Sequence, residues 1–174
     1  MTERIVPSLW FENGCEEAVN FYVSTFANAP GRRGTSRVLH IERYPEGIQN
    51  APWPPAMQGK VITAVFELDG QRFMALDGGP HFKPTGAVSL LINCDTQEEI
   101  DYFWTRLTDG GDPRAQQCGW LVDRYGFSWQ VHATPLEQML MSPDRPKANR
   151  AMQAMLGMKK LDIAALQAAY EGRG

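Results

Sequence analysis

Three side chains could carry acid–base chemistry or hold a ligand: His81, Gln130 and His132. His81 follows Gly-Gly-Pro in the stretch "FELDGQRFMALDGGPHFKP" (66–84), where glycines let the backbone bend sharply beside a rigid hairpin. Imidazole titrates near neutral pH, so His81 could act as a general acid or base. The alternative is structural: Gly-Gly-Pro shapes a crossover and His81 caps it. The sequence leaves both alternatives open.

Gln130 and His132 lie two positions apart in an expected strand, so their side chains share one face. An amide both donates and accepts hydrogen bonds, so Gln130 could orient a ligand. Together with His81, these two residues are the candidate catalytic groups. The structural alternative for His132 is a histidine whose hydrogen bonds are satisfied near a strand end, and we assign His40 a similar local role.

Aromatic side chains could line a pocket for a flat or apolar ligand. The candidate ligand-binding residues, including one carboxylate at a strand end, are Trp10, Trp53, Asp77, Phe82 and Trp129. Trp53 lies in the proline-rich stretch "PEGIQNAPWPPAMQG" (45–59), which predicts a long loop, and could serve as a lid. Asp77 could orient His81 or cap the turn, and the cap is the simpler interpretation.

These residues need strands and helices to position them, and the hydrophobic spacing predicts those elements. Apolar residues at intervals of three and four predict a helix from Cys15 to Phe26. Asp69-Gly70 predicts a tight hairpin turn. The expected strands are 4–11, 35–44, 60–68, 71–77, 87–94 and the two arms of a hairpin at 118–133, with a second helix at 95–111 and helices from there to the end.

An internal repeat indicates the architecture. Ser89 aligns with Ser8 at an offset of 89 − 8 = 81, and the same offset aligns the two helices. Gly126 aligns with Gly70 at 126 − 70 = 56, so the first copy is longer between helix and hairpin. We predict an α+β fold in which two βαβββ modules, at about 4–80 and 86–133, pair within a single domain of residues 1–174. Their mixed sheet would curve into a cup that admits a small molecule.

The remaining segment, about 135–172, predicts a helical extension. One helix begins at Ser142 or Asp144 and ends at Gly157, and a second is capped by Asp162 and ends at Gly172. Met152, Met155 and Leu156 form an apolar stripe on the first of these helices, as Ile163, Leu166 and Tyr170 do on the second. We expect the helices to cover the outside of the sheet or a neighbouring subunit.

Composition excludes several classes of partner. The formal net charge of −3, from 17 basic and 20 acidic residues, provides no basic stripe for nucleic acid. The sequence has neither a signal-peptide pattern nor an apolar run of membrane-spanning length, so we expect a soluble cytoplasmic protein. Three cysteines without a C-x-x-C pair suggest free thiols rather than disulfides or structural zinc.

The stretches "FELDGQRFMALDGGPHFKP", "CDTQEEIDYFW" and "QCGWLVDRYGFSWQV" resemble the PhnB-like branch of the vicinal oxygen chelate superfamily, which includes glyoxalase and bleomycin-resistance proteins. The resemblance extends from Ile5 to Tyr170. It implies the paired βαβββ cup and a homodimer. Members of this branch are often labelled 3-demethylubiquinone-9 3-methyltransferase-like.

The resemblance also implies where a metal would bind in metal-using relatives. The corresponding positions here are Ser8 or Trp10, Met74 or Leu76, Ser89 or Leu91, and Gln130 or His132. Divalent metals in such cups need at least three histidine or carboxylate donors. Only the last position offers a plausible donor, so we predict no cofactor, and a divalent metal has little support.

Two functions follow as expectations. One is acid–base chemistry, without a bound metal, on a carbonyl or enol compound. The alternative is a non-catalytic binder that sequesters an aromatic or hydrophobic compound. We expect no methyltransferase activity, because the chain lacks a glycine-rich turn that follows a strand and opens a helix.

Overall fold

The computed structural model describes residues 4–47, 49 and 54–173. The chain divides into two compact units, Met1–Lys83 and Pro84–Gly174. Their boundary falls between the two predicted repeats. Each unit has its own sheet, and in each a helix follows the first strand. The pairing of the repeats into one domain with a shared cup stays a prediction.

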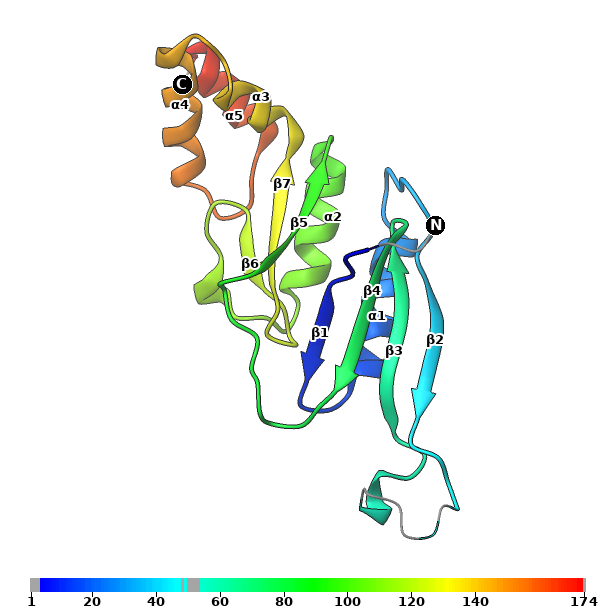
Figure 1. Cartoon of the computed structure of the whole chain (residues 1–174). Helices are drawn as coiled ribbons and strands as arrows, with labels where there is room; N and C mark the ends of the chain where they lie inside the picture. Colours follow the sequence, from blue (N-terminus) through cyan, green and yellow to red (C-terminus); the bar gives the residue numbers. More distant parts are fainter. Residues whose placement is uncertain (1–3, 48, 50–53, 174) are drawn as a thin grey trace. The chain divides into compact units, whose positions relative to one another are not determined.

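Unit 1 (residues 1–83) has the order strand, helix, three strands. Its elements are β1 (Ser8–Phe11), α1 (Cys15–Ala27), β2 (Arg37–Arg43), the 3-10 turn η1 (Pro55–Met57), β3 (Val61–Leu68) and β4 (Gln71–Asp77), as Figure 1 shows. The sheet order is β1-β4-β3-β2, in which β1 runs parallel to β4 and the other neighbours are antiparallel. The predicted βαβββ pattern is therefore confirmed for this unit.

Helix α1 covers one face of the unit 1 sheet. Its apolar side chains recur every three or four residues, and alternate residues of each strand point toward it. The buried residues from the two layers are Val19, Tyr22 and Phe26 of α1 and Leu9, Ala64, Phe66, Phe73 and Ala75 of the sheet. The residues between them, such as Trp10, Met74 and Leu76, therefore point to the opposite face, which we call the helix-free face of unit 1.

Unit 2 (residues 84–174) repeats this pattern with one strand fewer. It contains β5 (Ser89–Cys94), α2 (Gln97–Thr108), the 3-10 turn η2 (Pro113–Ala115), β6 (Trp120–Val122) and β7 (Ser128–Ala133). The sheet order is β5-β7-β6, with β5 parallel to β7. A fourth strand is expected between α2 and β6, but there the chain forms η2 and turns, including one at Gly110, whose φ is +75°. The second module is thus βαβββ-like.

Helix α2 begins with a capping box, in which Thr96 accepts from the Glu99 amide while the Glu99 side chain accepts from the Thr96 amide. Ile100, Phe103 and Leu107 bury its apolar side. This helix covers one face of the unit 2 sheet, as α1 does in unit 1.

Strand pairing tests the repeat directly. Ser8 pairs with Met74 in unit 1, and Ser89 pairs with Ser128 in unit 2. The first strands are offset by 89 − 8 = 81 residues, as predicted, whereas the last strands are offset by 128 − 74 = 54 rather than 56. Because the difference of two is even, each residue keeps its predicted face despite the shift.

Three helices complete unit 2: α3 (Thr134–Leu140), α4 (Arg145–Leu156) and α5 (Ile163–Glu171). Asp144 and Asp162 cap the N-termini of α4 and α5, and the predicted Gly157 and Gly172 are the C-cap residues that directly follow these helices. The helices pack against one another beyond the end of β7 rather than over the sheet (Figure 1). Among residues 4–47, 49 and 54–173, no helix combines the length and the hydropathy that a bilayer crossing requires.

The predicted apolar stripe on α4 is not its buried side. Ala148 and Ala151 are buried, whereas Met152 and Leu156 are exposed. The small alanines allow close helix packing, and the spacing of larger apolar residues alone did not reveal which side would be covered.

Candidate functional site

The face of the unit 2 sheet opposite α2, which we call the helix-free face of unit 2, brings together two of the predicted site residues. Gln130 and His132 both lie on this face of β7, as their spacing predicted. Gln130 sits opposite Leu91 on β5 and opposite Trp120 on β6. These two apolar side chains are 49% and 37% exposed. The amide of Gln130 therefore stands between two exposed apolar surfaces.

A hydroxyl fixes the orientation of the Gln130 amide. Its Nε2 donates a 2.7 Å hydrogen bond to Oγ of Ser89. This bond leaves the amide oxygen as an available acceptor. The side chain of His132 is half-buried on the strand position that pairs with Asn93, and it makes no hydrogen bond or ion pair with a described residue. A hydrogen bond thus holds the Gln130 side chain in place, whereas no hydrogen bond with a described residue holds the His132 ring.

Trp129, a predicted ligand-binding residue, lies on the other face of β7. It is 2% exposed, and its indole Nε1 donates a 2.7 Å bond to Oδ2 of Asp123. Because neighbouring strand residues point to opposite faces, Trp129 cannot share a face with Gln130. Trp129 belongs to the core beneath α2 and is left out of the site proposed below.

In unit 1, Trp10 and Phe82 contact each other. Their ring centroids lie 4.9 Å apart in an edge-to-face arrangement, and Trp10 Nε1 donates a 2.9 Å bond to the carbonyl of Gly79. A Cβ at Gly78 would lie 2.2 Å from the Trp10 ring, so the lack of a side chain at Gly78 is what allows the indole to pack there. The segment after β4 is therefore fastened to the helix-free face of unit 1 by Trp10.

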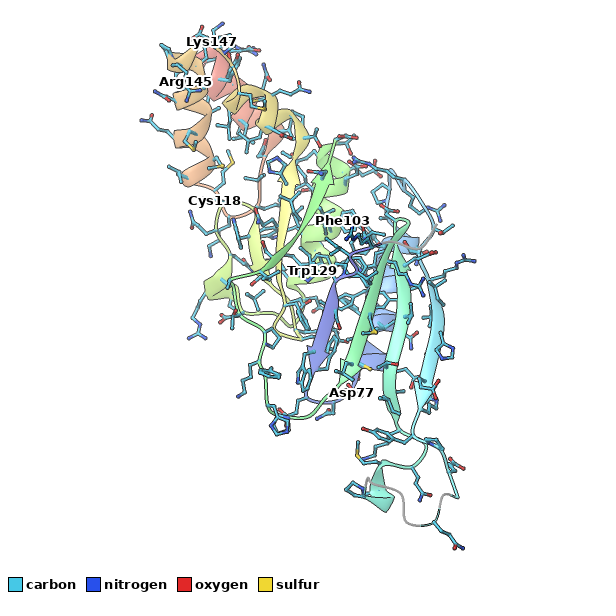
Figure 2. The ribbon with its side chains drawn as sticks, in the orientation of Figure 1. Asp77, Phe103, Cys118, Trp129, Arg145 and Lys147 are labelled. Carbon is cyan, nitrogen blue, oxygen red and sulfur yellow. The ribbon has the colours of Figure 1, made fainter. Side chains whose placement is uncertain are left out.

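Asp77 caps helix α1 from across the sheet. Its Oδ1 accepts from the Cys15 amide at 2.8 Å, and its Oδ2 accepts from the Gly14 amide at 3.1 Å. Figure 2 shows Asp77 at the end of β4. A carboxylate at a helix N-terminus satisfies free amides and complements the helix dipole. Of the two predicted roles, the structure supports capping, although the group capped is a helix rather than the turn.

His81 stands apart from these groups. Its side chain is exposed and forms no hydrogen bond or ion pair with a described residue, Asp77 included. His40 has the local partner that its strand position predicted, since its Nε2 lies 3.1 Å from Glu42 Oε2. Trp53, the predicted lid residue, lies outside the described residues. In residues 4–47, 49 and 54–173, no three histidine, cysteine or acidic side chains gather as a metal site would require.

Cys15, at the first turn of α1, is fully buried. Burial and then the neighbouring Asp77 carboxylate raise the pKa of the Cys15 thiol from 9.0 to about 12. A helix N-terminus normally lowers a thiol pKa, but here Asp77 already occupies the free amides. The geometry therefore favours an inert, protonated thiol.

This pKa has a measurable consequence for stability. Because the folded protein holds the Cys15 proton more tightly than the unfolded chain does, the resulting stabilisation is complete below pH 9.0 and is lost as the pH rises toward about 12. We expect the free energy of unfolding of Cys15→Ala, measured by urea titration, to fall less steeply than that of the wild type above pH 9.0. Because the substitution removes only the Cys15 thiol, the difference between the two slopes reports on that group. Parallel slopes would contradict the assignment.

Solved structures resemble the chain over most of its length. The PhnB protein from Bacillus cereus is 37% identical, and the match covers 76% of this chain and 100% of that one with a TM-score of 0.60. A protein from Pseudomonas aeruginosa is 25% identical over 76% of this chain and 98% of its own, with a TM-score of 0.54. The fosfomycin resistance protein FosX from Mesorhizobium loti shares the fold at 12% identity, covering 82% and 99% of the two chains with a TM-score of 0.52.

The two βαβββ-like modules and these matches define a protein of the glyoxalase and fosfomycin-resistance fold. A family model for 3-demethylubiquinone-9 3-methyltransferase matches residues 3–132. The chain therefore belongs to this PhnB-like family. No curated protein matches the sequence significantly.

Proposed function

We propose that the helix-free face of unit 2 binds a small organic molecule that has both an apolar surface and a hydrogen-bond donor. One observation carries this proposal: Ser89 holds the Gln130 amide between the exposed side chains of Leu91 and Trp120. Binding sites typically combine apolar walls with a few well-placed polar groups. Trp120 and Leu91 supply the apolar contact, and the Gln130 oxygen accepts from the ligand.

A second candidate function, acid–base chemistry on a bound carbonyl or enol compound, has support from His132. This residue lies one pleat along β7 from Gln130, on the same face, and its ring is half-buried without a described hydrogen-bond partner. An imidazole in that position can exchange a proton with a ligand held by Gln130. Catalysis would then depend on His132, whereas binding would depend on Gln130 and its apolar neighbours.

We infer that the family's methyltransferase name does not describe the chemistry of this chain. Binding of a nucleoside cofactor such as S-adenosylmethionine uses a glycine-rich turn between a strand and a helix. Gly78 and Gly79 follow β4, but residues 80–88 form no helix. Both sheets also contain antiparallel strand pairs, whereas nucleoside-cofactor sites of this type are built on a mostly parallel sheet. Isothermal titration with S-adenosylmethionine should show no binding, and measurable affinity would refute this inference.

The binding proposal can be tested by screening a set of aromatic ketones, phenols and quinols for compounds that raise the melting temperature. We expect at least one to bind, and Gln130→Leu and Leu91→Ala each to weaken its affinity by about tenfold or more. The matched controls Gln153→Leu and Leu156→Ala change exposed residues of the same types on α4 and should leave affinity unchanged. If Gln130→Leu and Leu91→Ala both left the affinity unchanged, the proposal would be wrong.

The same protein–compound complexes distinguish a non-catalytic binder from an enzyme. If a bound compound is recovered unchanged from the wild type, the protein acts as a binder. If it is converted, His132→Gln should abolish conversion while leaving affinity close to the wild-type value. Conversion that survives this substitution would exclude His132 as the acid–base group.

A further inference from the structure

A pocket of about 320 Å³ opens at one end of the unit 1 sheet, beside the first turn of α1. Its walls come from the segments that follow β1, β2 and β4 and from the segment that precedes β3. Its lining includes Glu12, Tyr44, Met57, Lys60, Val61 and Asp77. Gly78 and Gly79 also line it and contribute no side chains, which leaves space at the end of the central strand β4.

Two opposite charges border this pocket without partners in the described chain. Neither the Glu12 carboxylate nor the Lys60 ammonium forms an ion pair or a side-chain hydrogen bond with a described residue. Asp77 contributes a third charge, but both of its oxygens already accept from the amides that begin α1. The charged side chains at the pocket that make no hydrogen bond with a described residue are therefore one anion, Glu12, and one cation, Lys60.

Strand order fixes the separation of the two backbones that carry these exposed side chains. Glu12 directly follows β1 and Lys60 directly precedes β3, and both strands are neighbours of β4. Neighbouring strands lie about 4.8 Å apart, so the two backbones stand roughly 10 Å apart on either side of Gly78. Both side chains are long enough for their charged ends to approach one small molecule that lies between them.

Apart from Asn13, the remaining side chains of the lining are largely apolar. Val61 is buried and Met57 half-buried, and Tyr44 adds a half-buried aromatic ring. The volume lies at the lower end of the range for small-molecule pockets, about 300–1,000 Å³. A ligand that suits this lining carries an ammonium, a carboxylate and one apolar group.

We propose that this pocket binds a zwitterionic small molecule of the α-amino acid class with an apolar side chain. Glu12 contacts the ammonium, Lys60 contacts the carboxylate, and Met57 and Val61 contact the apolar group. The site lies at the strand ends of unit 1 and involves none of the residues proposed above to bind a ligand in unit 2.

The test is isothermal titration calorimetry of the full chain with three related compounds. L-phenylalanine carries both charges, 3-phenylpropionate lacks the ammonium, and phenethylamine lacks the carboxylate. We expect L-phenylalanine to bind and each analogue with a single charge to bind at least about tenfold more weakly. Equal binding of either analogue would overturn the proposal, as would failure of the folded protein to bind L-phenylalanine, L-leucine or L-methionine at millimolar concentration.

Substitutions in the pocket and in unit 2 show where L-phenylalanine binds. Glu12→Gln and Lys60→Met should each weaken L-phenylalanine binding by about tenfold or more. Glu137→Gln and Lys159→Met change exposed residues in unit 2 and should have no effect. If Gln130→Leu abolished L-phenylalanine binding while Glu12→Gln did not, the ligand would sit on the unit 2 face and the proposed pocket would be wrong. Urea unfolding of each variant confirms that the comparison is between folded proteins.

Discussion

Replacing Asp123 with alanine is expected to destabilise unit 2 by about 3–5 kcal/mol. The Asp123 carboxyl is buried and accepts hydrogen bonds from Trp129 Nε1 at 2.7 Å, from the Tyr125 amide at 2.9 Å and from the Phe127 amide at 3.0 Å. Alanine removes the Asp123 oxygen that accepts from the buried indole N–H, and a buried donor that loses its acceptor costs about 1–3 kcal/mol. The loop between β6 and β7 also loses its internal support.

Urea unfolding of two further variants tests the cause of this loss. Asp123→Asn keeps one acceptor oxygen and should cost about 1–2 kcal/mol. Trp129→Phe removes the indole donor, so Asp123→Ala should cost about 1–2 kcal/mol less in that background than in the wild type. Additive effects would show that the indole bond contributes nothing, and a cost below 1 kcal/mol for Asp123→Ala would contradict the whole account.

The second large effect is expected at Gly78. A methyl group there would stand 2.2–2.5 Å from three atoms of the Trp10 ring, so Gly78→Ala must displace the indole. The displacement would break the Nε1 bond to Gly79 and the edge-to-face contact with Phe82. Overpacking costs about 1–3 kcal/mol and a lost hydrogen bond about 1 kcal/mol, so we expect a loss of about 2–4 kcal/mol in the free energy of unfolding.

A matched glycine and a double variant control this prediction. Gly86→Ala meets only ordinary contact, with Ser128 Oγ at 3.8 Å from the added Cβ, so its effect should stay within about 1 kcal/mol. In the background of Trp10→Ala the clash at Gly78 disappears, and Gly78→Ala should then cost little. If Gly78→Ala remained equally harmful there, the Trp10 ring would not be the cause.

Much of the fold could be predicted because its signals are local. The turn at Asp69-Gly70, the caps at Asp144 and Asp162 and the helical spacing in 15–26 each depend on a few neighbouring residues. The offset of 81 between Ser8 and Ser89 identified the two modules before any strand pairing was known. The repeat predicted four strands in each unit, because it implies equal copies. It gives no information about a segment that has changed, so the absence of a fourth strand from the described part of unit 2 could not be foreseen.

The candidate site was only partly predictable. Strand alternation correctly placed Gln130 and His132 on one face, and the same rule separates Trp129 from them. Glu12 and Lys60 were missed, because they are 48 positions apart and no sequence signal connects the residue after β1 with the residue before β3.

The sequence by itself determined most of the helices and strands, the shared face of Gln130 and His132, and the presence of two related modules. The tertiary structure alone decided which distant groups meet: Asp77 with the amide of Cys15, Trp10 with the carbonyl of Gly79, and Gln130 with Ser89. The physical reason is that periodicity and capping arise from backbone geometry within a few residues. Contacts across a sheet depend instead on which strands become neighbours and in what register, and that choice is made by the packing of the whole unit.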